Sequence, residues 1–149
     1  MHPRSLGSPD FANDDGSADA GLVAALAAYG EDAGRLPQVL AALHTARVLT
    51  PVVARSLASG AGTGDGGAAV AVPLLEGEDG RRALPVFTSV AAMAAWDARA
   101  RPVPVAGRVA AAVARAEGAE VLVLDIAGPT TCVLDGLDLE ALIDGRYAG

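Results

Sequence analysis

The first third of the chain carries apolar side chains at helical spacing. Leu22, Leu26 and Tyr29 share one helical face, and Leu36, Val39, Leu40 and Leu43 share the face of a second helix. Recurrence in steps of three and four residues is typical of an amphipathic helix. We therefore expect one helix over residues 18–29, with Ser17 and Asp19 at its start, and a second helix over residues 36–46.

Short apolar and β-branched runs dominate the middle of the chain. They span residues 47–54, 70–75 and 82–87, and the turn EGEDG separates the last two. Runs of this length that are bounded by turn residues predict strands, and we expect these three to form an antiparallel meander. Pro51 indicates that the first strand lies at an edge of the sheet or ends irregularly, because proline cannot donate a ladder hydrogen bond.

Helical and strand patterns alternate in the remainder of the chain. The expected elements are a helix over residues 89–97, a loop through Pro102 and Pro104, a helix over residues 105–117, strands over residues 120–126 and 131–134, and a last helix capped by Asp138 that ends near Gly145. The face of the helix over 105–117 is expected to be Val105, Val109, Val113 and Ala116. The run EVLVLDI is apolar on both faces, which is typical of a central strand.

These elements together predict the fold class. We expect a single α/β (α+β) domain with a mixed sheet of about five strands, in which the antiparallel meander is followed by a helix-connected strand. The helices are expected to pack on the sheet.

Composition narrows the chemistry that the chain can perform. Hydrophobic residues make up 52% of the sequence but aromatic residues only 3%, so alanine, valine and leucine must build the core. Lysine is absent, which excludes a Schiff-base lysine and the lysine of a phosphate-binding Walker loop. The formal charge of −7 disfavours a nucleic-acid partner, because lysine and arginine supply most of that affinity.

The N-terminal segment and the single cysteine bear on where the protein works. Residues 1–16 are rich in serine, proline, glycine, asparagine and aspartate, so we expect a mobile acidic N-terminal tail followed by a domain over residues 17–149. The chain has no apolar run long enough to span a membrane and no apolar stretch of a secretion signal near its start. A single cysteine fits a reducing compartment. We expect a cytoplasmic protein without membrane contact.

Two junctions between elements hold candidate ligand contacts. The hydroxyls of Thr88 and Ser89, with the free N–H groups of the following helix, could hold an anion, although both residues are also common helix caps. Asp125 ends an apolar strand, where open α/β sheets place ligand contacts; alternatively its carboxylate accepts hydrogen bonds from the turn at Gly128 and Pro129. The candidate ligand or partner surface is Phe87, Thr88, Ser89, Trp96, Asp125, Gly128 and Pro129.

Three other patterns do not assemble an active site. Residues 62–67 match GxGxxG, but a strand rather than a helix follows, so we interpret this segment as a linker and expect no cofactor. His2 and His44 form no metal-ligand motif, so we expect no metal site. Cys132 has no neighbouring cation to lower its pKa, and an alternating strand can simply bury it, so we expect a structural thiol and no catalytic residues.

Several segments occur together in a combination that suggests a family. They are GRRALPVFTS at residues 80–89, Trp96, RPVP at residues 101–104 and LDIAGP at residues 124–129, preceded by FANDDGSAD at residues 11–19. With these segments the chain closely resembles the SseB family, the N-terminal domain of the enhanced serine sensitivity protein, in its high-GC actinobacterial form. The resemblance implies a cytoplasmic α/β domain linked to serine tolerance, and it brings no catalytic residues with it.

The function predicted from the sequence is a non-catalytic interaction or regulatory module with a protein partner. Two alternatives stay open. One is a thiol-dependent, sulfurtransferase-like enzyme that uses Cys132, and the other is a small-molecule or amino-acid sensor that binds near Thr88, Ser89 and Asp125.

Overall fold

The computed structural model describes residues 15–55, 69–128 and 130–145. The helices are α1 (Ala20–Glu31), the short 3₁₀ helix η2 (Ala33–Arg35), α2 (Leu36–Thr45), α3 (Val90–Trp96), α4 (Gly107–Ala116) and α5 (Gly136–Asp144). The strands are β1 (Arg47–Arg55), β2 (Ala69–Ala71), β3 (Leu75–Glu76), β4 (Arg82–Val86), β5 (Arg101–Ala106), β6 (Val121–Leu124) and β7 (Cys132–Leu134). The predicted linker at residues 62–67 lies outside the described residues, and so does the predicted tail except for Asp15 and Gly16.

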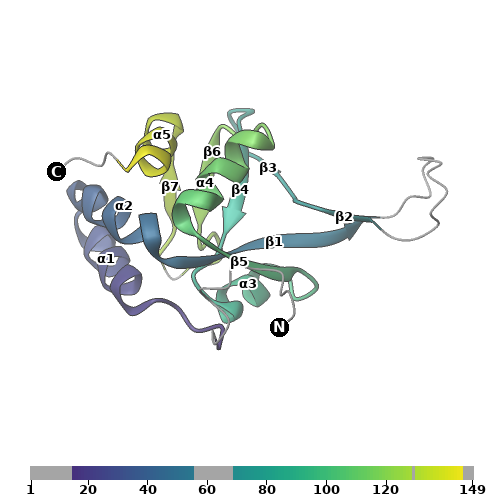
Figure 1. Cartoon of the computed structure of the whole chain (residues 1–149), viewed down its shortest axis with the longest axis horizontal. Helices are drawn as coiled ribbons and strands as arrows, with labels where there is room; N and C mark the ends of the chain where they lie inside the picture. Colours follow the sequence, from purple (N-terminus) through teal and green to yellow (C-terminus); the bar gives the residue numbers. More distant parts are fainter. Residues whose placement is uncertain (1–14, 56–68, 129, 146–149) are drawn as a thin grey trace, which may run out of the picture.

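The described strands form two sheets that are joined at one point. The first has the order β2-β1-β5 and is antiparallel throughout. The second has the order β3-β4-β6-β7, in which β4 and β6 are parallel and both outer pairs are antiparallel. Leu49 and Phe87 exchange backbone hydrogen bonds of 2.8 and 2.9 Å and so connect β1 to the end of β4. Figure 1 shows β1 and β2 extending as an arm beyond the helices.

Four helices bury one face of the four-stranded sheet. The main core contains Leu22 and Leu26 of α1, Val39, Leu40 and Leu43 of α2, Ala110, Ala111 and Ala114 of α4, Leu139 and Leu142 of α5, and the strand residues Leu84, Val86, Leu122, Leu124, Cys132 and Leu134. β6 lies between β4 and β7 and is buried along its whole length, as predicted for a central strand. The α/β class, the single domain and the packing of helices on a mixed sheet are thus confirmed, although the described strands exceed five and divide into two sheets. The expected three-stranded meander is interrupted, because the run at residues 70–75 divides into β2, which pairs with β1, and β3, which pairs with β4 in the other sheet.

β5 was wrongly predicted to be a loop because of its prolines. Pro104 lies opposite Leu49, and Pro102 lies opposite Pro51. The backbone N–H and carbonyl of Leu49 bond to Phe87, so Leu49 forms no ladder hydrogen bonds with Pro104. Bonded and non-bonded pairs alternate along an antiparallel ladder, so the Pro51–Pro102 pair, two residues further on, is also a non-bonded pair. β5 is also an edge strand, so a missing N–H on either proline costs no hydrogen bond.

The buried face of α4 also differs from the prediction. Val109 is exposed, whereas Ala110, Ala111 and Ala114 are buried. The reason is the close approach of α2: a Cβ placed on Gly107 would lie 1.9 Å from the carbonyl oxygen of Leu43. Only small side chains fit between two helices at this distance, so steric space rather than side-chain hydrophobicity selects the face.

Two helix boundaries need correction. α1 ends at Glu31, two residues after the predicted end at residue 29. α5 is capped by Asp135 rather than by Asp138: the Asp135 carboxylate accepts from the Asp138 N–H and the Asp138 carboxylate accepts from the Asp135 N–H, which forms a reciprocal capping box. Gly145 ends α5 in the left-handed conformation, as expected.

Candidate functional site

The chain turns from β4 into α3 at Thr88 and Ser89. Ser89 is the N-cap of α3, and its hydroxyl accepts a hydrogen bond of 3.0 Å from the Ala92 N–H, as predicted. The Val90 N–H donates to the Gly16 carbonyl oxygen at 2.9 Å, so the segment before α1 also covers the start of α3. These two N–H groups are therefore already satisfied, which argues against the anion site that the sequence allowed here.

Asp125 meets Thr88 because their strands are parallel neighbours. Val86 at the end of β4 pairs with Leu124 at the end of β6, which brings the residues that follow to the same edge of the sheet. The Thr88 N–H donates to Asp125 Oδ1 at 2.8 Å, and the Thr88 hydroxyl donates to Asp125 Oδ2 at 2.8 Å. This is the edge where α/β sheets commonly bind ligands.

The Asp125 carboxylate is buried and has no counter-ion among the residues that the structure describes. The residue is 4% exposed, and it forms no ion pair with any residue of the described ranges. Burial raises the pKa of Asp125 above its usual value, and the two hydrogen bonds from Thr88 oppose that rise. The backbone of Asp125 has a φ of 54°, which is uncommon for a residue other than glycine.

The turn after Asp125 is held by the backbone of Asp125 and not by its carboxylate. The Asp125 carbonyl oxygen accepts from the Gly128 N–H and from the Thr131 hydroxyl, both at 2.8 Å. The sequence-based alternative, in which the carboxylate binds the turn at Gly128 and Pro129, is therefore wrong for Gly128; Pro129 lies outside the described residues. The carboxylate is oriented by Thr88 instead.

Arg47, which was not predicted as a site residue, also supports the β4–α3 junction. Its side chain is buried at the start of β1, where Nη1 donates to the Thr88 carbonyl oxygen at 2.9 Å and Nη2 donates to the Ser17 carbonyl oxygen. The guanidinium thus links the segment before α1 to the β4–α3 turn. The available signal was a charged residue at the head of an apolar strand, which does not by itself reveal its partners.

A half-open groove of about 690 Å³ lies over this junction, between α1 and α3. It is lined by Ala18, Val23, Leu26, Ala27, Thr88, Ser89, Ala91, Ala92, Ala95, Asp125, Ala127, Gly128 and Thr130. Four predicted site residues, Thr88, Ser89, Asp125 and Gly128, therefore share one cavity. Six of these thirteen residues are alanines, and Thr88, Ser89 and Asp125 lie just after the ends of β4 and β6. We call this cavity the α1–α3 groove.

Phe87 and Trp96, the two aromatic candidates, do not line the α1–α3 groove. Phe87 is fully buried with Leu49 and Met93, and Trp96 packs against this cluster while remaining partly exposed. Their ring centroids are 5.4 Å apart and the ring planes are tilted by 31°. This aromatic pair fastens α3 to the junction between the two sheets, which is a structural role.

Cys132 lies in the main core and not in the groove. It is 0% exposed, and burial raises the pKa of its thiol to about 11, even though a hydrogen bond with Tyr29 acts in the opposite direction. A thiol with this pKa is almost entirely protonated at neutral pH and is a poor nucleophile. The prediction of a structural thiol agrees with this environment.

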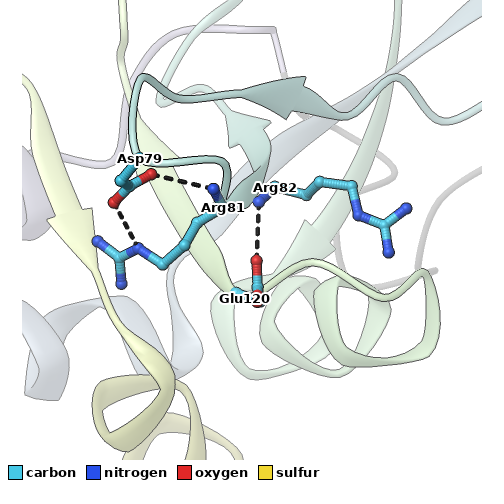
Figure 2. A network of polar contacts seen from close by, with 4 residues as sticks. All are labelled: Asp79, Arg81, Arg82 and Glu120. Carbon is cyan, nitrogen blue, oxygen red and sulfur yellow. Dashed lines mark hydrogen bonds and ion pairs between the residues drawn. The ribbon is translucent and has the colours of Figure 1, made fainter.

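The opposite ends of β4 and β6 carry a separate network of charged residues. The Arg81 N–H and Nε donate to the two carboxylate oxygens of Asp79 at 3.0 and 2.8 Å. The Arg82 N–H donates to Glu120 Oε1 at 3.0 Å, while the Arg82 guanidinium extends away from Glu120 (Figure 2). These contacts hold the β3–β4 turn against the start of β6, far along both strands from the groove.

The described residues contain neither a metal-ligand cluster nor a membrane-spanning helix. Among the residues that the structure describes, no group of three or more histidine, cysteine, aspartate or glutamate side chains is placed to hold a metal ion. Within the same ranges, no helix has the length and apolar character needed to cross a membrane.

Comparison with known proteins supplies one match. The family model for the SseB protein N-terminal domain matches residues 22–141, which include most of α1, the whole β4–α3 junction and Asp125. No curated protein and no solved structure matches the chain. The match spans most of the sequence and agrees with the resemblance seen in its segments, so this chain belongs to the SseB family through the N-terminal domain of that family.

Proposed function

We propose that this SseB domain is a non-catalytic interaction and regulatory module that binds a segment of a protein partner in the α1–α3 groove. We place its action in the cytoplasm and, following the family resemblance, in the cellular response to serine. The observation that carries the proposal is the groove itself, which is built over the hydrogen-bonded pair of Thr88 and Asp125.

The open side and the apolar walls of the groove favour a peptide segment over a small metabolite. Its volume of about 690 Å³ is large enough for either kind of ligand, so the volume does not decide between them. The groove is open along one side, and Val23 on the α1 wall is 46% exposed. Exposed apolar side chains beside a groove are typical of surfaces that bind a partner.

The non-catalytic part of the proposal follows from how the reactive groups are used. The Ser89 hydroxyl caps α3 and the Thr88 hydroxyl binds Asp125, and the described residues that line the groove include no histidine or cysteine. The thiol-dependent alternative would need Cys132, whose buried and protonated thiol is poorly suited to attack a substrate.

The test is to fill the groove without disturbing the core. Ala95 on α3 and Ala27 on α1 are exposed and line opposite walls, so Ala95→Trp and Ala27→Trp place an indole in the groove. Ala41→Trp adds the same side chain to an exposed position on α2 outside the groove and serves as the matched control. Each variant replaces the chromosomal copy in the native host.

We expect both groove variants to abolish co-purification of the partner and to reproduce the serine phenotype of a strain that lacks the protein. Ala41→Trp should behave as wild type. If the groove variants retain both the partner and the phenotype while remaining folded, the groove is not the recognition surface and the proposal fails.

A small-molecule sensor is the second candidate, favoured by the single buried carboxylate at the floor of the groove. A thermal-shift screen with serine, other amino acids and phosphate tests it, because a ligand that binds only the folded state raises the melting temperature. Stabilisation by one of these compounds that Ala95→Trp abolishes would favour the sensor over the protein-binding module.

A further inference from the structure

We propose that the α1–α3 groove recognises a basic side chain, lysine or arginine, of the partner segment, whose charged head group binds the Asp125 carboxylate. This inference rests on the proposed function and adds the chemistry of the ligand. It assigns Asp125 as the residue that determines specificity.

The charge distribution of the groove selects a cation. Among the described residues that line the groove, Asp125 is the only charged one, and the protein as a whole carries a formal charge of −7. A buried carboxylate is unfavourable unless a positive charge or several hydrogen bonds compensate it. Thr88 supplies two hydrogen bonds, but no described residue supplies the positive charge. A basic side chain from a partner would supply it.

The carboxylate has the hydrogen-bonding capacity for such a ligand. Each oxygen of an ionised aspartate offers about two acceptor sites, and Thr88 occupies one site on each oxygen. Thr88 also fixes the orientation of the carboxylate, so ligand binding carries no additional entropic cost of ordering this side chain. One ammonium or guanidinium group can therefore bind the remaining acceptor sites at the floor of the groove.

The apolar walls fit the rest of a basic side chain. Lysine and arginine carry an aliphatic stem that packs against apolar surface while the head group binds a polar partner. The stem would run along the alanine methyl groups of α3, from Ala95 and Ala92 toward Asp125. The start of α3 is less suited to an acidic ligand, because the N–H groups of Val90 and Ala92 are already bonded.

The experiment is an NMR titration of the isotope-labelled full chain. The probe is Nα-acetyl-lysine-N-methylamide, which presents a lysine side chain as it occurs within a peptide. The norleucine analogue has the same stem without the ammonium group and serves as the neutral control. Free serine tests whether an unlinked amino acid, with its α-ammonium group, uses the same carboxylate.

The Asp125→Asn variant isolates the charge. Asparagine adopts a positive φ more readily than most residues. Its amide oxygen can accept from the Thr88 N–H, and its NH₂ group can donate to the Thr88 hydroxyl oxygen, so we expect the fold to be retained. A dispersed amide spectrum that matches the wild type verifies this.

We expect the lysine probe to shift the amides of Thr88, Ala92 and Gly128 in wild type, with an affinity at least about tenfold higher than that of norleucine, which corresponds to about 1.4 kcal/mol. Asp125→Asn should remove this difference. Equal binding of lysine and norleucine, no binding of either, or preferential binding of free serine would overturn the inference.

The failure of this inference can be told apart from failure of the proposed function. If Ala95→Trp loses the partner but Asp125→Asn retains it with wild-type affinity, the groove binds a partner and the basic side chain is not what it recognises. If Ala95→Trp retains the partner, the groove is not the docking surface and both proposals fall.

Discussion

Replacing Thr88 by valine removes the hydroxyl that donates to Asp125 and keeps the branched shape of the side chain. A hydrogen bond to a charged group contributes about 1.5–3 kcal/mol to stability, whereas a neutral one contributes about 1 kcal/mol. Thr50→Val is the matched control, because Thr50 is equally buried and donates to a neutral acceptor, the Val103 carbonyl oxygen, at 3.2 Å. We expect Thr88→Val to lower the free energy of unfolding by about 2 kcal/mol at neutral pH, roughly twice the cost of Thr50→Val.

The cost of Thr88→Val should also depend on pH. The folded-state pKa of Asp125 is raised, so the stability associated with this group is fully present below its unfolded-state pKa and is lost as pH rises through the folded-state pKa. The Thr88 hydroxyl lowers the folded-state pKa, so its removal raises that pKa further and increases the loss. The penalty of Thr88→Val should therefore be largest at neutral pH and shrink in acid, where Asp125 is protonated in both proteins.

Urea unfolding at neutral and mildly acidic pH measures both effects. With a denaturant slope of 1–3 kcal/mol per molar urea, a loss of about 2 kcal/mol moves the midpoint by roughly 1 M. Equal slopes for wild type and variant would show that the shift reports stability. A cost no greater than that of Thr50→Val, or a cost that does not change between the two pH values, would refute the account of a buried, hydrogen-bonded carboxylate.

Three further predictions test the surrounding structure. Gly107→Ala should destabilise the protein by roughly 3 kcal/mol, because the added methyl group would collide with the Leu43 carbonyl. Gly136→Ala is the control, at the first position of α5 and in open space, and should change stability by less than about 1 kcal/mol. Similar costs for both variants in calorimetry would contradict the packing of α4 on α2. Ser89→Ala should cost about 1 kcal/mol through loss of the α3 cap, and an unchanged melting temperature would count against that cap. The thiol of Cys132 should react with a thiol reagent far more slowly in the folded than in the unfolded protein, and Cys132→Ala should keep the cellular phenotype; fast labelling or loss of the phenotype would revive the thiol-dependent enzyme.

The fold class could be predicted because periodic apolar positions report local structure directly. The runs at α2, β4 and β6 carry unambiguous spacing, and Ser89 and Gly145 mark helix ends by their own chemistry. Sequence reasoning failed where tertiary contacts override local preference. The prolines of β5 are tolerated because they lie at an edge and opposite positions of β1 that form no ladder hydrogen bonds with β5; Leu49, opposite Pro104, bonds to Phe87 instead.

The members of the site could be proposed from sequence, but their arrangement could not. Thr88 and Asp125 each stand at the end of an apolar strand, which suggested both as ligand contacts. Their pairing depends on β4 and β6 being parallel neighbours, which no local pattern encodes. The wall formed by α1 and the support from Arg47 depend on how distant segments pack, and the sequence gives no periodic signal for either.

The most direct test of the central claim is site-specific photo-crosslinking in the native host. A photoreactive phenylalanine analogue is placed at Ala95 within the α1–α3 groove or at Ala41 on α2, both exposed positions on helices. The account predicts one discrete crosslinked partner from position 95 and none from position 41, and the same adduct should weaken when Asp125→Asn is added. A partner that crosslinks from position 41 but not from position 95 would contradict the assignment of the groove as the recognition surface.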